Sequence, residues 1–270
     1  MMRLAHLSDM HFCAAGEKLF DSLDVNAQNA DIIHQLNQLD DPVDAIIITG
    51  DVVNDGHPEQ YRQAAKILQY ANCPVYLING NHDERDAFCE AFRLLCPLIE
   101  VGRPIRYTLE YGGHQLLLVD STIPGETHGA IDDELANWIE QHLKASELPT
   151  VLFMHHPPLS MNNAHMDPLR CINGSRLLAL ADRYPQFRGI YCGHNHRFSV
   201  SQYRQLVVVV APATSVQIPC YRERSTPLYN MEPPSCLIHS ITSEGRWVSH
   251  QHLLSRLNGE RHFPWVKGMS

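Results

Sequence analysis

The chain has 270 residues, enough for one large domain, and its hydrophobic share of 44% is typical of a globular protein. No apolar run approaches the roughly 20 residues of a membrane span, so we expect no membrane-embedded segment. The formal net charge is -9, without a basic run, which argues against a nucleic acid as partner.

The N-terminal segment favours the cytoplasm, and the cysteines favour free thiols. Residues 1–9 become polar too early for a signal peptide. The eight cysteines are scattered without a C-x-x-C pair, so we expect free thiols rather than a disulfide framework.

The first two thirds of the chain alternate predicted strands and helices, and the last third contains strands alone. Continuous apolar runs predict buried strands, and a period near 3.6 predicts helices. Asp83 is expected to cap the third helix, and Gly112-Gly113 is expected to join a hairpin. The predicted strands are 4–8, 45–49, 74–78, 106–111, 114–120, 150–154, 189–192, 198–203, 206–211, 236–241 and 247–252. The predicted helices are 25–39, 58–70, one carrying Phe88, Phe92 and Leu95, 132–143 and 175–184.

This order predicts an α/β fold in which the C-terminal strands complete the sheets. Residues 1–255 are expected to form this domain. Within it, residues 212–236 are irregular and rich in Pro, Ser and Tyr, which predicts a cap, an interface between subunits, or a loop over the active site. Residues 256–270 are expected to form a C-terminal tail, either mobile or docked on a partner subunit.

Five short segments place potential metal ligands at the ends of predicted strands. In open α/β sheets, ligands collect at the carboxyl ends of strands, so we expect these side chains to converge. If strand geometry persists, alternation places Asp9 beside His11 and His194 beside His196. Glycines before three of the ligands allow close backbone approach. The segments are Asp9-Met10-His11, Gly50-Asp51, Gly80-Asn81-His82-Asp83, His155-His156 and Gly193-His194-Asn195-His196.

The residue types suit two divalent cations. A carboxylate such as Asp51 can bridge two metals, while Asn81 offers a weaker neutral oxygen. The mixed oxygen and nitrogen set suits Fe, Zn, Mn or Co. Two divalent cations (+4), the carboxylates of Asp9 and Asp51 (-2) and a bridging hydroxide (-1) leave +1. That charge matches a phosphodiester better than a phosphomonoester, which carries about two negative charges.

The five segments match, in order, the pattern D-x-H, GD, GNH[DE], H and GHxH, and the chain resembles the calcineurin-like metallophosphoesterases over roughly residues 1–255. Within that family it is most similar to the class III cyclic nucleotide phosphodiesterase branch, and there to bacterial glycerophosphodiesterases. The resemblance implies a four-layer α/β/β/α sandwich with a small C-terminal cap or dimerisation region. It also implies a homo-oligomer, a dimer or a hexamer. Stretches beyond the metal motifs that carry this likeness include Gly16-Glu17-Lys18-Leu19, Asp24-Val25-Asn26-Ala27 and Met166-Asp167-Pro168.

The resemblance also implies which residues bind each of two metal ions, with Asp51 as a ligand of both. The first cation would be held by Asp9, His11, Asp51 and His196. The second would be held by Asp51, Asn81, His155 and His194. His156 would lie beside a ligand without binding a metal.

The implied reaction is hydrolysis of a small phosphodiester of the glycerophosphodiester type by a metal-activated hydroxide. The expected catalytic residues are Asp51 and His82, with His82 beside the substrate as proton donor to the leaving alkoxide. Two positions depart from the glycerophosphodiesterase pattern, since Val216 replaces a histidine and Phe20 replaces a tyrosine. These changes bear on which diester is bound.

Three alternatives stay open beside this hypothesis. A cyclic nucleotide phosphodiesterase would use the same scaffold. A phosphomonoesterase would need extra arginines near the metals, and only Arg170 and Arg197 lie close to the motifs. A non-catalytic metal-binding scaffold is less favoured, because every ligand position holds a competent residue.

Overall fold

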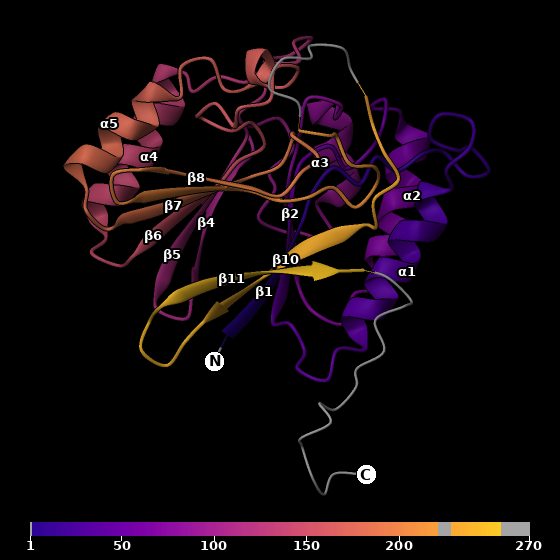
Figure 1. Cartoon of the computed structure of the whole chain (residues 1–270), viewed down its shortest axis with the longest axis horizontal. Coiled ribbons are helices and arrows are strands. Elements are labelled where there is room, and N and C mark those ends of the chain that lie inside the picture. The colour runs from indigo at the N-terminus through magenta and orange to yellow at the C-terminus, as the bar shows by residue number, and fades with distance from the viewer. Residues whose placement is uncertain (1, 221–227, 255–270) are drawn as a thin grey trace, which may run out of the picture.

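Two β-sheets pack face to face, with helices on the outer face of each, in a computed structural model that describes residues 2–220 and 228–254 (Figure 1). Three helices flank the first sheet: α1 (Val25–Asn37), α2 (Pro58–Leu68) and α3 (Arg85–Phe92). Two flank the second: α4 (Asp133–Ala145) and α5 (Ser175–Arg183). A short 3-10 helix, η1 (Asp167–Leu169), precedes α5. The predicted α/β/β/α arrangement is confirmed.

The first sheet joins both ends of the described chain. Its order is β11-β10-β1-β2-β3, with β1, β2 and β3 parallel and β10 antiparallel to β1. The C-terminal strands therefore complete the N-terminal sheet, as predicted. The strands are β1 (Met2–Leu7), β2 (Ala45–Thr49), β3 (Val75–Ile78), β10 (Ser235–Ile241) and β11 (Trp247–Leu253).

The second sheet has the order β4-β5-β6-β7-β9-β8. The predicted hairpin is present, because Tyr111 pairs with His114 across Gly112 and Gly113, which both adopt positive φ. The strands are β4 (Arg106–Tyr111), β5 (His114–Val119), β6 (Thr150–Phe153), β7 (Phe187–Cys192), β8 (Ser199–Tyr203) and β9 (Leu206–Val210).

Alternating side chains of the second sheet contribute to two cores. On β5, Leu116 and Leu118 join the core shared with the first sheet, while Leu117 and Val119 join the core under α4 and α5. Burial on both faces explains why the strands appear in the sequence as continuous apolar runs. An aromatic cluster lies where the sheets meet, formed by His6, Phe153, Tyr191, His239 and Trp247.

The predicted cap of α3 was wrong. Glu84 caps this helix, because its carboxylate accepts hydrogen bonds from the amides of Asp86 and Ala87. The Asp83 carboxylate instead accepts from three amides that precede the helix: those of Gly80 (2.8 Å), Val52 (3.1 Å) and Val53 (3.2 Å). Asp83 thus ties together the two loops that follow β2 and β3.

Part of the predicted cap or interface lies outside the described residues, as does the predicted tail at 256–270. The described parts of 212–236 are largely irregular before β10, and Gln217 and Asn230 pair through both main-chain hydrogen bonds (3.2 and 2.8 Å). All eight cysteines are unpaired, as expected. Among the helices of the described residues, none has the length and apolarity to cross a bilayer.

Candidate metal centre

The ligand-bearing segments leave their strands through left-handed backbone turns. β1 ends at Leu7 and β7 at Cys192, and Asp9, His11, Asp51, His194 and His196 all have φ between 48° and 71°. Strand geometry therefore does not persist through these segments, so alternation does not explain why Asp9 and His11 nevertheless lie close together. A positive φ is uncommon outside glycine and clusters at functional sites, where surrounding contacts hold it.

Main-chain hydrogen bonds hold these turns against one another. The amide of Asp9 donates to the Gly50 carbonyl (3.1 Å), and the amide of His11 donates to the Asp51 carbonyl (3.0 Å). The amide of His194 donates to both oxygens of the Asp9 carboxylate (3.1 Å each). These bonds join the segments that carry Asp9, Asp51 and His194, so the backbone of each segment helps to position the next.

Glycine is required where two of the loops meet. A Cβ atom at Gly80 would collide with the main chain and carboxylate of Asp51. A Cβ atom at Gly193 would collide with the hydroxyl of Ser8. Close packing, rather than unusual φ, selects glycine at these two positions, in line with the role expected for the motif glycines.

One cluster of potential ligands contains Asp9, His11, Asp51 and His196. All four residues are buried, and their ligand atoms lie within 4.8 Å of one another. The Nε2 atoms of His11 and His196 are 3.1 Å apart. Nε2 of His196 lies 3.4 Å from the Asp9 carboxylate, and Nε2 of His11 lies 3.8 Å from that of Asp51.

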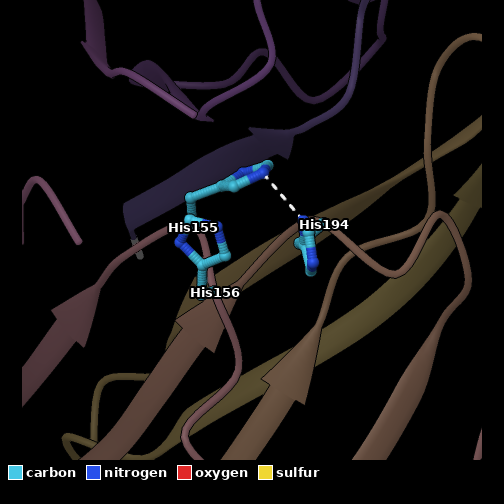
Figure 2. Close-up of side chains that lie close together, drawn as sticks. All are labelled: His155, His156 and His194. Carbon is cyan, nitrogen blue, oxygen red and sulfur yellow. Dashed lines mark hydrogen bonds between the residues drawn. The ribbon is translucent and has the colours of Figure 1, made fainter. Parts of the chain in front are cut away.

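A second cluster surrounds Nε2 of His155. This atom lies 3.1 Å from Oδ1 of Asn81, 3.3 Å from Nδ1 of His194 and 3.4 Å from Oδ2 of Asp51. Figure 2 shows the ring of His155, from the end of β6, reaching toward His194, from the end of β7. Asp51 is therefore shared between the two clusters.

His156 also lies within reach of this second cluster. Its ring, with those of His155 and His194, forms a group whose ligand atoms lie within 4.8 Å of one another (Figure 2). However, Nδ1 of His156 is hydrogen-bonded to the hydroxyl of Ser121 (2.9 Å). Nε2 of His155 is the atom that lies close to the side-chain oxygens of Asn81 and Asp51. We therefore expect a cation bound by His155 to contact these two oxygens rather than His156.

Backbone carbonyls set the tautomer of two histidines. Nδ1 of His155 donates to the carbonyl of Thr49 (2.7 Å), and Nδ1 of His196 donates to the carbonyl of Val216 (2.8 Å). Because a carbonyl can only accept, Nε2 of each ring is the nitrogen that faces the cluster as a potential ligand. Such outer partners orient metal-binding histidines and fix their tautomer.

The electrostatics of the clusters suit cation binding. Burial lowers the pKa of His11 and of His194 well below the usual value, which keeps these rings neutral. Although burial raises the pKa of the Asp51 carboxyl, His155 and His82 outweigh it and hold that pKa well below its usual value. Burial lowers the pKa of His155, but Asp51 more than compensates and raises it to about 9. A cation at that site would therefore take the place of a proton.

The donor geometry fits a pair of divalent cations. Ligand nitrogens and oxygens bind a metal such as Zn at about 2.0–2.2 Å, so donors separated by 3.1–3.8 Å can share one ion. Imidazole and carboxylate together suit Zn, Fe, Mn or Co. Asp51 is placed to contact an ion in each cluster.

His82 belongs to neither cluster. Its ring lies edge-on to that of His11, with centroids 4.8 Å apart, and its Nδ1 donates to the carbonyl of Asn54 (2.7 Å). The amide of His82 donates to Oδ1 of Asp51 (2.9 Å). The exposed ring lines a pocket of about 340 Å³ beside the first cluster. The attraction of the Asp51 carboxylate raises the pKa of His82.

Several site residues carried no signal in the sequence. The carbonyls of Thr49, Asn54 and Val216 orient ligand or pocket histidines, and a carbonyl is present at every position of a chain. The pocket also includes His165 and Tyr229, which belong to none of the five ligand-bearing segments. Only proximity in the fold identifies these residues.

Comparisons with known proteins agree with this geometry. Residues 2–198 match the family described as calcineurin-like phosphoesterase. The chain is 44% identical over 267 residues to the glycerophosphodiester phosphodiesterase GpdQ of Enterobacter lignolyticus, covering 98% of this chain and 94% of that protein. It is 26% identical over 218 residues to the 3',5'-cyclic adenosine monophosphate phosphodiesterase CpdA of Vibrio vulnificus, covering 80% of this chain and 77% of the relative.

The fold of this chain is also similar to that of a solved structure. A dimetal phosphatase from Danio rerio superposes with a TM-score of 0.68 at 12% identity, over 94% of this chain and 99% of that one. At that identity the likeness concerns the fold, and the family rests on the sequence matches. The chain belongs to the calcineurin-like phosphoesterase family.

Proposed function

We propose that this chain is a phosphodiesterase that requires two divalent metal ions and hydrolyses small phosphodiesters of the glycerophosphodiester type. One observation carries the proposal: the Asp51 carboxylate is shared by two ligand clusters, with Oδ2 3.8 Å from Nε2 of His11 and 3.4 Å from Nε2 of His155. Two ions bridged by one carboxylate are typical of sites at which hydroxide displaces an alkoxide from phosphorus. The 44% identity to a glycerophosphodiester phosphodiesterase supports the same activity.

The residues that would hold the two ions follow from the clusters. The first ion would be bound by Asp9, His11, Asp51 and His196. The second would be bound by Asp51, Asn81, His155 and His194. We propose Fe, Zn, Mn or Co as the ions, because the donors mix imidazole nitrogen with carboxylate and amide oxygen.

When bound, the two cations would activate a water molecule toward phosphorus and neutralise charge on the phosphoryl oxygens. Asp51 would hold their separation. His82 projects into the pocket beside the first site, with Nδ1 occupied by the carbonyl of Asn54. Its Nε2 atom is thus the one that can deliver a proton to the leaving oxygen.

A diester fits this site better than a monoester. The more highly charged monoester would call for arginines at the pocket, and the described lining residues include none. The two arginines near the motifs are engaged elsewhere. Arg170 donates to the carbonyl of Asp167 (2.5 Å), and Arg197 donates to the carbonyl of Ile218 (2.6 Å) and pairs with Glu232 (2.7 Å).

A cyclic nucleotide phosphodiesterase is the second candidate, supported by the similarity to CpdA of Vibrio vulnificus. A phosphomonoesterase or a non-catalytic metal-binding scaffold has less support. Location in the cytoplasm and assembly into a dimer or a hexamer remain predictions, as does the assignment of 212–236 as a cap or interface.

The decisive experiment compares bis(4-nitrophenyl) phosphate with 4-nitrophenyl phosphate, on purified protein supplied in turn with Mn, Co and Zn. Both substrates release the same phenol, so the leaving group is constant, and the substrates differ in the charge on phosphorus and in one retained aryl group. We expect kcat/KM for the diester to exceed that for the monoester at least tenfold, with no turnover after chelation. A preference for the monoester would refute the proposed function, and so would undiminished turnover in chelator.

A further inference from the structure

A line of polar side chains crosses the first sheet on the face that meets the second sheet. It takes one residue from each of four neighbouring strands, in the sheet order β11-β10-β1-β2. The residues are Ser249, His239, His6 and Thr49. The last three are fully buried, and none of the four belongs to a metal cluster.

Hydrogen bonds join this polar line from end to end. The Ser249 hydroxyl lies 2.8 Å from Nδ1 of His239. Nε2 of His239 lies 3.2 Å from Nδ1 of His6, and Nε2 of His6 lies 2.8 Å from the Thr49 hydroxyl. All four ring nitrogens therefore have a partner within the line.

The two rings of the polar line act as a unit. Both are neutral, because burial lowers the pKa of His6 to about 3 and the pKa of His239 well below its usual value. A neutral imidazole has one N–H donor and one acceptor nitrogen. Since each contact needs one donor, the donors of both rings point the same way along the line, and neither ring can change its tautomer alone.

Packing alone does not require polar side chains at this place. His6 lies edge-on to Phe153 and His239 edge-on to Tyr191, with ring centroids 5.3 and 4.7 Å apart. Apolar side chains would suit these aromatic surroundings, and replacing both partners of a buried hydrogen bond by apolar groups can be nearly neutral for stability. The line therefore calls for a role other than filling the core.

The polar line ends at the residue that orients His155. The Thr49 carbonyl accepts hydrogen bonds from Nδ1 of His155 (2.7 Å) and from the Ser8 hydroxyl (3.1 Å). Thr49 is the last residue of β2, and Gly50 follows with φ of 88°. Because strand pairing ends here and glycine leaves the backbone free to turn, the side-chain bond of Thr49 helps to fix the direction of its carbonyl.

The connection from His6 to His155 transmits position rather than protons. It runs through the main chain of Thr49, whose carbonyl accepts hydrogen bonds but carries no proton. A shift of the Thr49 hydroxyl would instead turn this carbonyl. The ring of His155, whose Nε2 faces Asn81 and Asp51, would turn with it.

We propose that His6 is a positioning residue for the second metal site and is itself held by His239 and Ser249. Through the Thr49 hydroxyl, His6 fixes the carbonyl that orients His155 as a ligand. This inference rests on the two-metal centre of the proposed function. It predicts that the polar line affects the second ion far more than the first.

The test measures Co²⁺ binding to the metal-free protein by calorimetry, without substrate. His11→Ala/His196→Ala removes two ligands of the first cluster, so this background reports the second site. Asn81→Ala/His194→Ala removes two ligands of the second cluster, so this background reports the first site. Further substitutions are then compared in both backgrounds.

Matched substitutions separate the contact with Thr49 from the rest of the polar line. Thr49→Val removes the hydroxyl but keeps the carbonyl. The amide of His6→Asn takes the place of Nδ1 and loses Thr49, while the longer His6→Gln places its amide near the position of Nε2 and keeps that contact. At the second site, Thr49→Val and His6→Asn should raise the Kd for Co²⁺ about fivefold or more, because losing a direct outer partner of a ligand typically costs about 10–100-fold. His6→Gln should stay within about twofold, as should all three substitutions at the first site.

A control and a stability measurement complete the test. His114→Asn changes another buried histidine, at the amino end of β5, and should leave both affinities within about twofold. Denaturant unfolding of the metal-free variants measures the purely structural contribution of the line. Loss of stability in Thr49→Val and His6→Asn without a change in Kd at the second site would overturn the inference, and so would an equal rise of Kd at both sites.

Failure of the proposed function gives a different result. A protein that binds two Co²⁺ ions but turns over no diester would refute the phosphodiesterase activity alone, while the affinities would still decide the role of His6. Absence of Co²⁺ binding in the background that reports the second site would refute the two-metal centre and this inference together.

Discussion

The metal clusters and the pocket beside the first cluster differ in how their side chains are held. The cluster residues Asp9, Asp51 and His155 are buried, and hydrogen bonds with neighbouring backbone fix them. In the lining of the pocket, Phe20 and Tyr229 are about half exposed and their rings stack on each other. Chemistry that depends on exact ligand positions is thus carried by the rigid region. At the half-exposed rings, a side chain can change with less disturbance of the fold.

The largest effect is expected from removing the shared carboxylate. Asp51→Ala should weaken binding of both cations by more than 100-fold, because losing even an outer partner of a ligand typically costs about 10–100-fold. Turnover of a diester should be abolished. Metal content by mass spectrometry after dialysis measures the loss, with the exposed Asp40→Ala as control. Two retained ions per chain would show that Asp51 does not bridge.

The next effect is expected from the histidine between the two regions. His82→Ala should lower kcat by about 10²–10⁴-fold, the usual contribution of a general acid, while both cations stay bound. Metal content distinguishes a proton donor from a metal ligand at this position. His82 lies next to the expected ligand Asn81 in the chain but outside both clusters. Metal analysis and steady-state kinetics on the same preparation provide the check. Loss of one equivalent of metal would instead make His82 a ligand.

Close packing under the clusters predicts a further effect. In Gly193→Ala, the added methyl group collides with the Ser8 hydroxyl, and overpacking of this kind typically costs about 1–3 kcal/mol of unfolding free energy. The displaced loop should also lower metal affinity at least tenfold. Denaturant unfolding and metal titration measure both. Ser8→Gly/Gly193→Ala removes the contact with the Ser8 side chain, but the added methyl group still lies 2.9 Å from the Thr49 carbonyl oxygen. This double variant should therefore bind metal more tightly than the single one and less tightly than the unsubstituted protein.

The smallest effect is expected from a surface ion pair next to Ile218, which lines the pocket. Glu232→Gln removes the ion pair with Arg197, whose side chains are 48% and 26% exposed. Exposed pairs contribute about 0–1 kcal/mol, and Arg197 keeps its bond to the Ile218 carbonyl. We expect less than a threefold change in diester turnover. A loss above 2 kcal/mol in denaturant unfolding would mean that this pair organises the pocket wall.

The sequence predicted what depends on local pattern. The run Ala45–Thr49 is apolar at almost every position because β2 is buried on both faces, and its predicted bounds match the observed strand. The ligand-bearing segments were recognisable because the chemistry demands particular residue types at strand ends. The same local logic failed for Asp83, whose carboxylate binds amides of a different loop rather than its own helix.

The remaining features depend on contacts between distant residues. The left-handed turns at Asp9 and His194 are stabilised across 185 positions of sequence, by the bond from the His194 amide to the Asp9 carboxylate. The stacking of Phe20 on Tyr229 depends on the pairing of Gln217 with Asn230. Neither arrangement leaves a periodic or compositional trace, so sequence alone could not predict it.

The position of β10 next to β1 in the first sheet has a consequence for biosynthesis. Because β10 pairs with β1, the strand that leads into Asp9 keeps one open edge until ribosomal synthesis has passed residue 241. Unpaired strand edges attract other chains, so a nascent polypeptide with its ligand-bearing loops already made is still prone to aggregate. Competence to capture metal should therefore arise late, only after the C-terminal hairpin of β10 and β11 has joined the sheet.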